Sequence, residues 1–147
     1  MELRIKTFPQ LSTGELYEIL RLRSEVFIVE QHGCYQDLDG IDYHSFHIFA
    51  LAPEGSCLGC IRVFQKEEDP GTVQLGRLVV KHRMQGLGRQ LMEAAEQTAR
   101  QQYGAVRTFL TGRASARGFY EKCGYTAQVP EDYTEETAPY FLFQKTL

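Results

Sequence analysis

The sequence has no apolar run long enough for a transmembrane helix, because its unbroken apolar stretches are only a few residues long. Residues 1–5 also lack the basic segment followed by an apolar stretch that marks a signal peptide. Internal repeats and low-complexity segments are absent. The formal net charge is only −3, which argues against a general nucleic-acid binder. These absences favour a cytoplasmic protein that acts neither in a membrane nor on nucleic acid.

Cysteine is scarce, and the four cysteines are Cys34, Cys57, Cys60 and Cys123. Cys57 and Cys60 form a Cys-x-x-Cys pair, but a zinc site would need a second pair and a thioredoxin-type site would begin a helix. The pair lies instead in a strand-like run, where residues three apart are expected on opposite faces. We therefore expect four reduced thiols and no bound metal.

The 147 residues are 43% hydrophobic and 24% charged, which is enough for one domain over residues 1–147 with its own core. Charges of opposite sign occupy different segments. Residues 74–123 carry nine basic and three acidic side chains, whereas residues 25–42 carry five carboxylates and no lysine or arginine. A basic surface beside an acidic one would hold an anionic and a cationic ligand together. Charge alone favours the alternative, in which both sets face water.

The pattern of the chain predicts one sheet covered by helices. Ser12-Thr13-Gly14-Glu15 is a capping box, and the apolar residues after it predict a helix running toward Ile28. We expect further helices over 89–103 and 114–122, and strands over 47–52, 57–64, 72–80, 106–110, 125–129 and 140–145. This order predicts an α+β (mixed α/β) domain with a mostly antiparallel sheet.

A loop with Gly86 and Gly88 joins the strand at 72–80 to the next helix. Glycines at such a junction expose backbone N–H groups at the positive end of the helix dipole, which suits a phosphate group. A dinucleotide fold would have a third glycine where Leu91 stands, and the Gly-Lys-Ser/Thr of a P-loop is absent. A nucleotide module of another kind stays an alternative.

The Arg83-x-x-Gly86-x-Gly88 pattern after a hairpin strand resembles the pyrophosphate loop of the GNAT superfamily of N-acetyltransferases. A second segment, residues 114–125 with Tyr120-Glu121-Lys122, resembles the C-terminal signature of that family. Residues 26–31, 35–42 and 47–48 resemble the ElaA-like members. The resemblance covers nearly the whole chain, and it implies a splayed pair of parallel strands within the sheet.

The resemblance implies an acetyl-CoA-dependent N-acetyltransferase, in which the amine of a small molecule or protein attacks the thioester directly, without a metal. Tyr120 would be the general acid that protonates the departing CoA thiolate, since a phenol with a pKa of about 10 is protonated at neutral pH. Its alternative role is to pack its helix on the sheet. Glu30 is the favoured base. The other candidates for the base are His47, Asp37, Asp39 and Asp42.

The cofactor-binding residues implied by the resemblance come from the strand end, the loop, the helix start and two basic side chains. They are Leu78, Val79, Val80, Arg83, Met84, Gln85, Gly86, Leu87, Gly88, Arg89, Arg113 and Lys122. The loop before Arg83 is shorter than in relatives, so a second alignment would use residues 76–78 instead of 78–80. We favour 78–80 because these residues form the apolar end of the strand. Arg113 replaces a common asparagine, and because a guanidinium accepts no hydrogen bond, we assign it to a phosphate.

Two departures from the family pattern, the short loop before Arg83 and the loss of the asparagine at position 113, keep a second function open. They leave a non-catalytic acyl-CoA-binding or regulatory domain as the alternative, although the retained Tyr120 argues against it. A third departure bears on substrate choice: Tyr140 stands where ElaA-like relatives commonly have histidine, and a phenol cannot replace an imidazole as a base near pH 7. A free edge on the last strand would also allow pairing in a homodimer.

Overall fold

The computed structural model describes residues 2–65, 68–82, 86–134 and 139–147. Seven strands in the described residues form one sheet in the order β1-β2-β3-β4-β5-β7-β6. The strands are β1 (Leu3–Thr7), β2 (Phe46–Leu51), β3 (Cys57–Gln65), β4 (Thr72–Val80), β5 (Arg107–Arg113), β6 (Thr126–Gln128) and β7 (Tyr140–Thr146). The helices are α1 (Thr13–Arg23), α2 (Leu87–Tyr103) and α3 (Arg117–Lys122), with short 3-10 turns at Phe8–Gln10, Ile41–His44 and Ala114–Ala116. The predicted fold class is confirmed.

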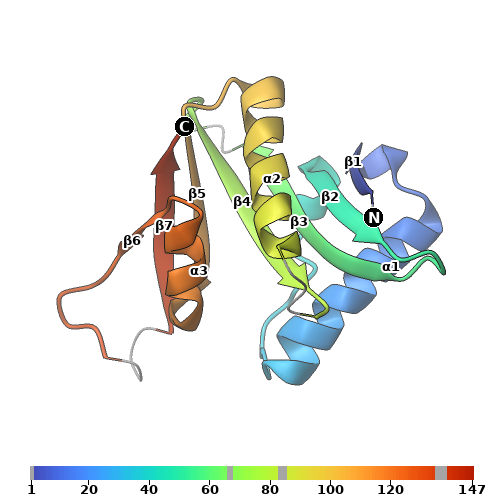
Figure 1. Cartoon of the computed structure of the whole chain (residues 1–147), viewed down its shortest axis with the longest axis horizontal. Coiled ribbons are helices and arrows are strands. Elements are labelled where there is room, and N and C mark those ends of the chain that lie inside the picture. Colours follow the sequence, from blue (N-terminus) through green and yellow to red (C-terminus); the bar gives the residue numbers. More distant parts are fainter. Residues whose placement is uncertain (1, 66–67, 83–85, 135–138) are drawn as a thin grey trace.

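The sheet divides at β4 and β5, which form its parallel pair. Their register runs only from Thr72 opposite Arg107 to Gln74 opposite Phe109, and then the strands diverge. Every other neighbouring pair in the sheet is antiparallel. Figure 1 shows β4 and β5 meeting at one end and spreading toward the other. The predicted splayed pair is therefore present, and the space between the strands opens toward the end of β4.

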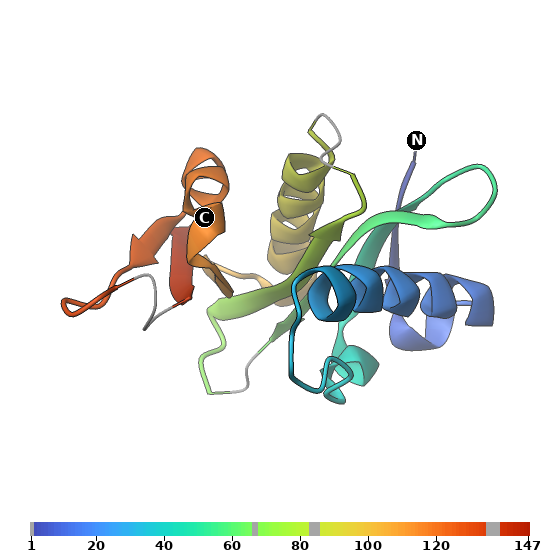
Figure 2. The same cartoon turned by 90° about the horizontal axis from the view of Figure 1, so that it is seen from below.

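Helices cover both faces of the sheet, and each face has its own core. On one face, Leu87, Leu91 and Met92 of α2 pack against strand residues such as Ile48 and Val63. On the other face, a smaller cluster includes Ile19 and Leu22 of α1 together with Phe49, Cys57, Cys60 and Val79. Figure 2 shows α1 and α2 on opposite sides of the strands. Burial on both faces explains why β2 and β3 are apolar along most of their length.

The predicted capping box at the start of α1 is confirmed. The backbone N–H of Glu15 donates to Ser12 Oγ at 3.0 Å, and the backbone N–H of Ser12 donates to Glu15 Oε1 at 2.8 Å. The sequence predicted a helix continuing to Ile28, but α1 ends at Arg23 and a π-helical turn follows over Ser24–Glu30. This wider turn closes with a hydrogen bond from Gln31 N to the carbonyl of Val26 at 3.0 Å.

The prediction that Cys57 and Cys60 lie on opposite faces is wrong. In the β2–β3 register, Ala50 pairs with Gly59 but Leu51 pairs with Cys57, so β3 carries one extra residue. This bulge resets the alternation of the strand, and both thiols point into the α1-side core with 2% exposure. All four cysteines are free thiols, as predicted.

The prediction of a free edge on the last strand is also wrong. β7 lies between β5 and β6, so it is not the outermost strand, although β6 pairs with only three of its seven residues. The order of strands depends on pairings between distant segments, which the local pattern of the sequence does not encode.

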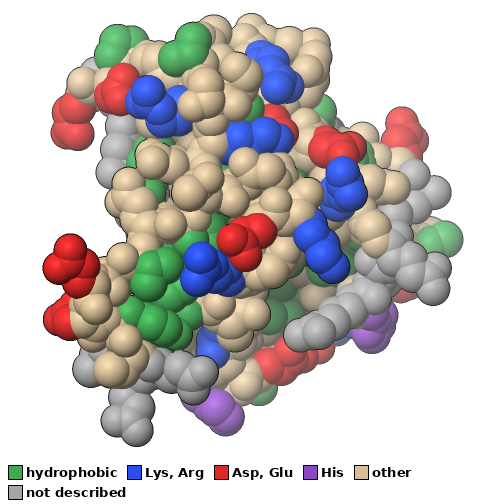
Figure 3. All heavy atoms as spheres, turned by 60° about the vertical axis from the view of Figure 1, so that its left-hand side comes forward, with side chains coloured by type: hydrophobic (Ala, Val, Ile, Leu, Met, Phe, Trp, Pro, Cys, Tyr) green, Lys and Arg blue, Asp and Glu red, His purple; other side chains and the backbone are tan. Residues whose placement is uncertain are grey.

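Over the residues described here, no helix is long and apolar enough to cross a membrane. On the face in Figure 3, acidic and basic side chains are interleaved, with no broad area of one sign.

Candidate active site

Two adjoining cavities occupy the space between β4 and β5. The larger, of about 790 Å³, extends from the end of β4 to the start of α2 and to α3. The smaller, of about 420 Å³, extends toward the π-helical turn and β7. Both volumes lie in the range of about 300–1,000 Å³ that is usual for small-molecule sites. Five residues line both cavities and mark their junction: Gln31, Leu78, Arg113, Ala116 and Tyr120.

A bulge in β4 shapes the wall of both cavities. Arg62 pairs with Gly76 and Cys60 pairs with Val79, so Arg77 and Leu78 together face one residue of β3. Arg77 takes a left-handed conformation with φ of 55°, which costs a non-glycine residue about 1–2 kcal/mol. After this bulge, Leu78, Val79 and Val80 line the larger cavity, where the favoured alignment had placed the cofactor-binding strand residues.

The start of α2 forms one end of the larger cavity. Gly86 caps the helix with φ of 83° and lines this cavity together with Gly88 and Arg89. A Cβ on Gly88 would lie 3.2 Å from Phe119 Cζ, so this glycine lets α3 approach closely. Leu87 lies in the core instead, with 1% exposure, and lines neither cavity. Free backbone N–H groups in a first helical turn suit an anionic group.

The other predicted cofactor residues fall into two groups. Lys122 lines the larger cavity, while Arg113 lines both cavities. Arg83, Met84 and Gln85 lie outside the described residues.

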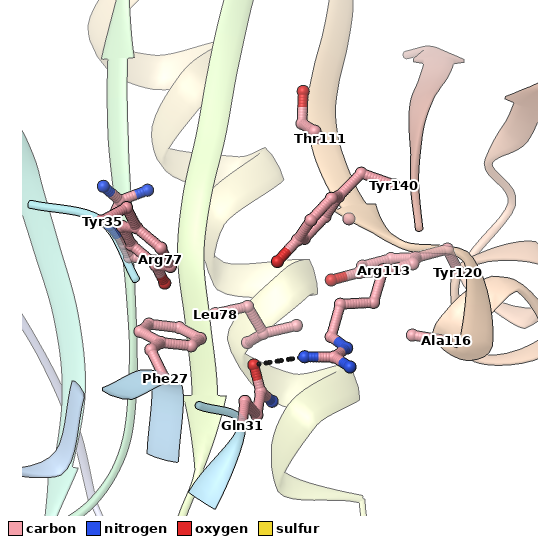
Figure 4. A pocket seen from close by; sticks show the side chains of 11 residues that line it. Phe27, Gln31, Tyr35, Arg77, Leu78, Thr111, Arg113, Ala116, Tyr120 and Tyr140 are labelled. Carbon is pink, nitrogen blue, oxygen red and sulfur yellow. Dashed lines mark hydrogen bonds between the residues drawn. The ribbon is translucent and has the colours of Figure 1, made fainter. Parts of the chain in front are cut away.

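Tyr120 sits where the two cavities meet. Its side chain is 8% exposed and packs between the rings of Phe119 and Phe143. Gly112 of β5 makes room for it, because a Cβ there would lie 2.6 Å from Tyr120 Cε2. Burial raises the pKa of Tyr120 to about 12, and the nearby Cys123 adds to the shift. Figure 4 shows the hydroxyl groups of Tyr120 and Tyr140 pointing into the space between β4 and β5.

A hydrogen bond crosses the junction between the two cavities. Arg113 Nη1 at the end of β5 donates to Gln31 Oε1 at 3.0 Å, and Gln31 directly follows the π-helical turn (Figure 4). Among the described residues, Arg113 has no carboxylate partner. Its guanidinium has five N–H donors, so most of them remain for a ligand.

Behind the smaller cavity lies a closed ring of six alternating charges. Each guanidinium bridges two carboxylates, and each carboxylate bridges two guanidiniums, with N–O distances of 2.7–3.3 Å. In order around the ring, the residues are Arg23, Asp37, Arg77, Asp39, Arg62 and Asp42. The ring joins the end of α1, the segment after the π-helical turn, β3 and β4, and its net charge is zero. It holds Arg77 in its strained conformation.

Three of the candidate bases, Asp37, Asp39 and Asp42, are members of this ring and pair with its guanidiniums. Burial opposes ionisation of Asp42, but hydrogen bonds and charge from Arg23 and Arg62 outweigh it and lower its pKa. The same balance, with Arg62 as the main partner, lowers the pKa of Asp39 to about 2. Asp37 and Asp42 are buried, so the prediction that the acidic segment faces water is wrong for them.

The remaining candidate bases lie away from the cavities. His47 is buried, with Nε2 at 2.9 Å from the carbonyl oxygen of Asp42, and burial lowers its pKa. Glu30 is exposed, so its proposed role gains no support from the geometry. None of the five candidate bases lines either cavity.

Sequence reasoning missed several residues that build the site. Gln31, Phe27 and Tyr35 reach the smaller cavity only because the π-helical turn redirects the chain after Arg23. No local pattern in the sequence predicts that turn. Gly112 did offer a signal, because an isolated glycine within a strand often marks a close approach.

Comparison with known proteins agrees with this geometry. The profile of the acetyltransferase (GNAT) family matches residues 15–125. The chain belongs to the GNAT acetyltransferase family. Its resemblance to the ElaA-like members is confirmed, since it is 31% identical to protein ElaA of Escherichia coli over 89% of this chain and 87% of ElaA. The crystal structure of that ElaA superposes with a TM-score of 0.86 over 98% of both chains.

Two further solved structures of this family's fold are similar. An acyl-CoA N-acyltransferase from Pseudomonas aeruginosa is 34% identical, with a TM-score of 0.84 over 99% of both chains. The PaiA N-acetyltransferase of Thermoplasma acidophilum, solved in complex with coenzyme A, is 17% identical, with a TM-score of 0.70 over the full length of both chains. At that identity the second comparison shows the fold alone.

Proposed function

We propose that the protein is an acetyl-CoA-dependent N-acetyltransferase that transfers the acetyl group directly to an amine of a small molecule or protein. The observation that carries this proposal is the position of Tyr120, whose hydroxyl lies where two cavities meet between the splayed strands. The larger cavity takes the cofactor, and the smaller one takes the amine. The thioester then lies at the junction, within reach of both.

The larger cavity has what each part of CoA needs. Backbone groups of Leu78, Val79 and Val80 bond the pantetheine arm, and the first turn of α2 holds the pyrophosphate. Arg89 and Lys122 supply positive charge at that end. We include Arg83, Met84, Gln85 and the backbone of Leu87 in this group on the strength of the motif. The CoA complex of the Thermoplasma relative supports the same use of the fold.

In the reaction, the amine nitrogen attacks the thioester carbonyl, a C–N bond forms and the C–S bond breaks. The departing thiolate then takes a proton from Tyr120, the acetylated nitrogen releases its extra proton to water, and water returns a proton to the Tyr120 phenolate. Its raised pKa of about 12 keeps the phenol protonated at neutral pH. Burial also raises the pKa of a thiol, so the thiolate is a stronger base in the cleft than in water. Burial of the thiolate therefore reduces the difference in pKa between Tyr120, the proton donor, and the CoA thiol, the proton acceptor.

Thiol release from acetyl-CoA, measured against a panel of amines, tests this proposal. Tyr120→Phe should lower amine-dependent release at least about tenfold while CoA affinity, measured by calorimetry, stays the same. Tyr43→Phe is the matched control, since Tyr43 is exposed, packs against Phe8 and lines neither cavity. CoA binding without turnover of any amine would support the non-catalytic acyl-CoA-binding domain instead. A protein that does not bind CoA would refute both functions.

A further inference from the structure

The smaller cavity is suited to an acceptor that carries a negative charge. Its charged lining residues, among those described, are Arg77 and Arg113, and no described carboxylate lines it. Arg77 is neutralised within the ring of six charges by Asp37 and Asp39. Arg113 bonds only the neutral amide of Gln31 among the described side chains. A polycation would therefore enter this cavity without a negative partner, which costs free energy. A carboxylate, in contrast, would pair with the positive charge of Arg113.

The position of Arg113 separates it from the pyrophosphate end of the cleft. Arg89 and Lys122 line only the larger cavity, at the start of α2 and at α3. Arg113 lines both cavities, beside Leu78 and Tyr120. A carboxylate held by Arg113 therefore lies next to the thioester carbon and not at the phosphate end. An amine that is to attack from such an acceptor must be only a few bonds from its carboxylate.

The walls of the smaller cavity are aromatic. Phe27, Tyr35 and Tyr140 line it, and Tyr35 and Tyr140 are 44% and 48% exposed. Figure 4 shows Tyr35 and Phe27 on one side of β4 and Tyr140 on the other. Arg77 holds the Tyr35 ring, with its guanidinium carbon 5.6 Å from the ring centroid. Rings arranged in this way bury an apolar or aromatic group of the acceptor.

We propose, on the basis of the acetyltransferase function above, that the acceptor is a free α-amino acid with an apolar or aromatic side chain, and that Arg113 binds its carboxylate. The α-amine then faces the thioester at the junction, and the side chain lies among the three rings. This assignment moves Arg113 from the cofactor, where the sequence had placed it, to the acceptor.

The test compares phenylalanine with phenylalaninamide, in which a neutral amide replaces the carboxylate, and with spermidine. Phenylalanine should have the highest kcat/KM, exceeding the amide by about tenfold or more. Arg113→Gln should remove this preference while leaving the affinity for CoA within about twofold of the wild type. Arg117→Gln is the matched control, because Arg117 is exposed, pairs with Glu121 and lines neither cavity. It should keep the preference.

Binding measurements separate this inference from the proposed function. Phenylalanine and phenylalaninamide are titrated by calorimetry into the protein saturated with CoA, so the result does not depend on turnover. Tighter binding of phenylalanine, lost in Arg113→Gln, supports the inference. Equal binding of the two ligands, a preference for spermidine, or a preference that survives Arg113→Gln would overturn it. A fall in CoA affinity in Arg113→Gln with the preference retained would return Arg113 to the phosphate.

Discussion

Replacing Asp42 with asparagine should strongly destabilise the fold, because it breaks the ring of six charges. Asp42 accepts hydrogen bonds from Arg23 at 2.7 and 3.2 Å and from Arg62 at 3.1 Å. In Asp42→Asn, one of these oxygens becomes an NH₂ group that faces a guanidinium, and three guanidiniums share two carboxylates. Arg23 is 1% exposed, so water cannot replace the lost charge. Removing one partner of a buried ion pair costs about 3–5 kcal/mol.

Urea unfolding followed by circular dichroism measures the change in the free energy of unfolding. Thermal unfolding measures the change in Tm. For a chain of this size each kcal/mol lowers the Tm by about 2–4 °C, so we expect a fall of about 6–20 °C. Glu121→Gln is the matched control, because Glu121 makes an exposed pair with Arg117 at 3.6 Å. It should change the free energy of unfolding by less than about 0.5 kcal/mol. If Asp42→Asn unfolds like the control, the ring does not stabilise the fold and the reasoning is wrong.

Three further predictions concern the cleft and its surroundings. Gly112→Ala should lower turnover as Tyr120→Phe does, because the new Cβ would lie 2.6 Å from Cε2 of Tyr120; unchanged kinetics would contradict the predicted displacement of the ring. Gly86→Ala should weaken CoA binding in calorimetry, while Gly104→Ala, with φ of 64° at the other end of α2, should cost a similar stability but leave CoA affinity intact. The pKa of Asp39 is lowered in the fold from 3.8 to about 2, so its stabilising contribution is present above pH 3.8 and is lost toward pH 2. The urea midpoint should fall over that range, and it should fall less in Asp39→Asn.

Local signals in the sequence predicted much of the fold. The strand over 72–80 has the predicted bounds, and α2 ends at Tyr103 with Gly104 in the left-handed conformation that a C-cap glycine adopts. These elements depend on apolar periodicity and on caps, which lie within a few residues of one another. The glycine loop and the Tyr120 segment were found in the same way, since each is a contiguous motif.

What the sequence did not predict depends on contacts between distant residues. The ring joins Arg23 to Asp42 and Arg62, and its members look like ordinary surface charges when taken singly. The bulge at Arg77 changes which residues of β4 face the cleft, yet nothing in the local pattern marks it. The bond from Arg113 to Gln31 spans 82 positions. Such pairings form only once the sheet and the π-helical turn are in place.

Because β4 and β5 pair over only three residues, the geometry of the cleft depends on the angle between the two strands. One side of the cleft is formed by β4, with Leu78, Val79 and Val80. The other side is formed by β5 and α3, with Arg113 and Tyr120, and the two strands pair only over Thr72–Gln74 of β4. A small rotation about that paired segment moves the strands farthest apart at the open end, where the two cavities meet. Two hydrogen-bonded contacts oppose this rotation. Lys145 of β7 donates to Glu96 of α2 at 3.0 Å, and Arg113 reaches Gln31 across the opening. Substitutions near the paired segment of β4 and β5 can thus misalign the two sides of the cleft without changing any residue that lines it.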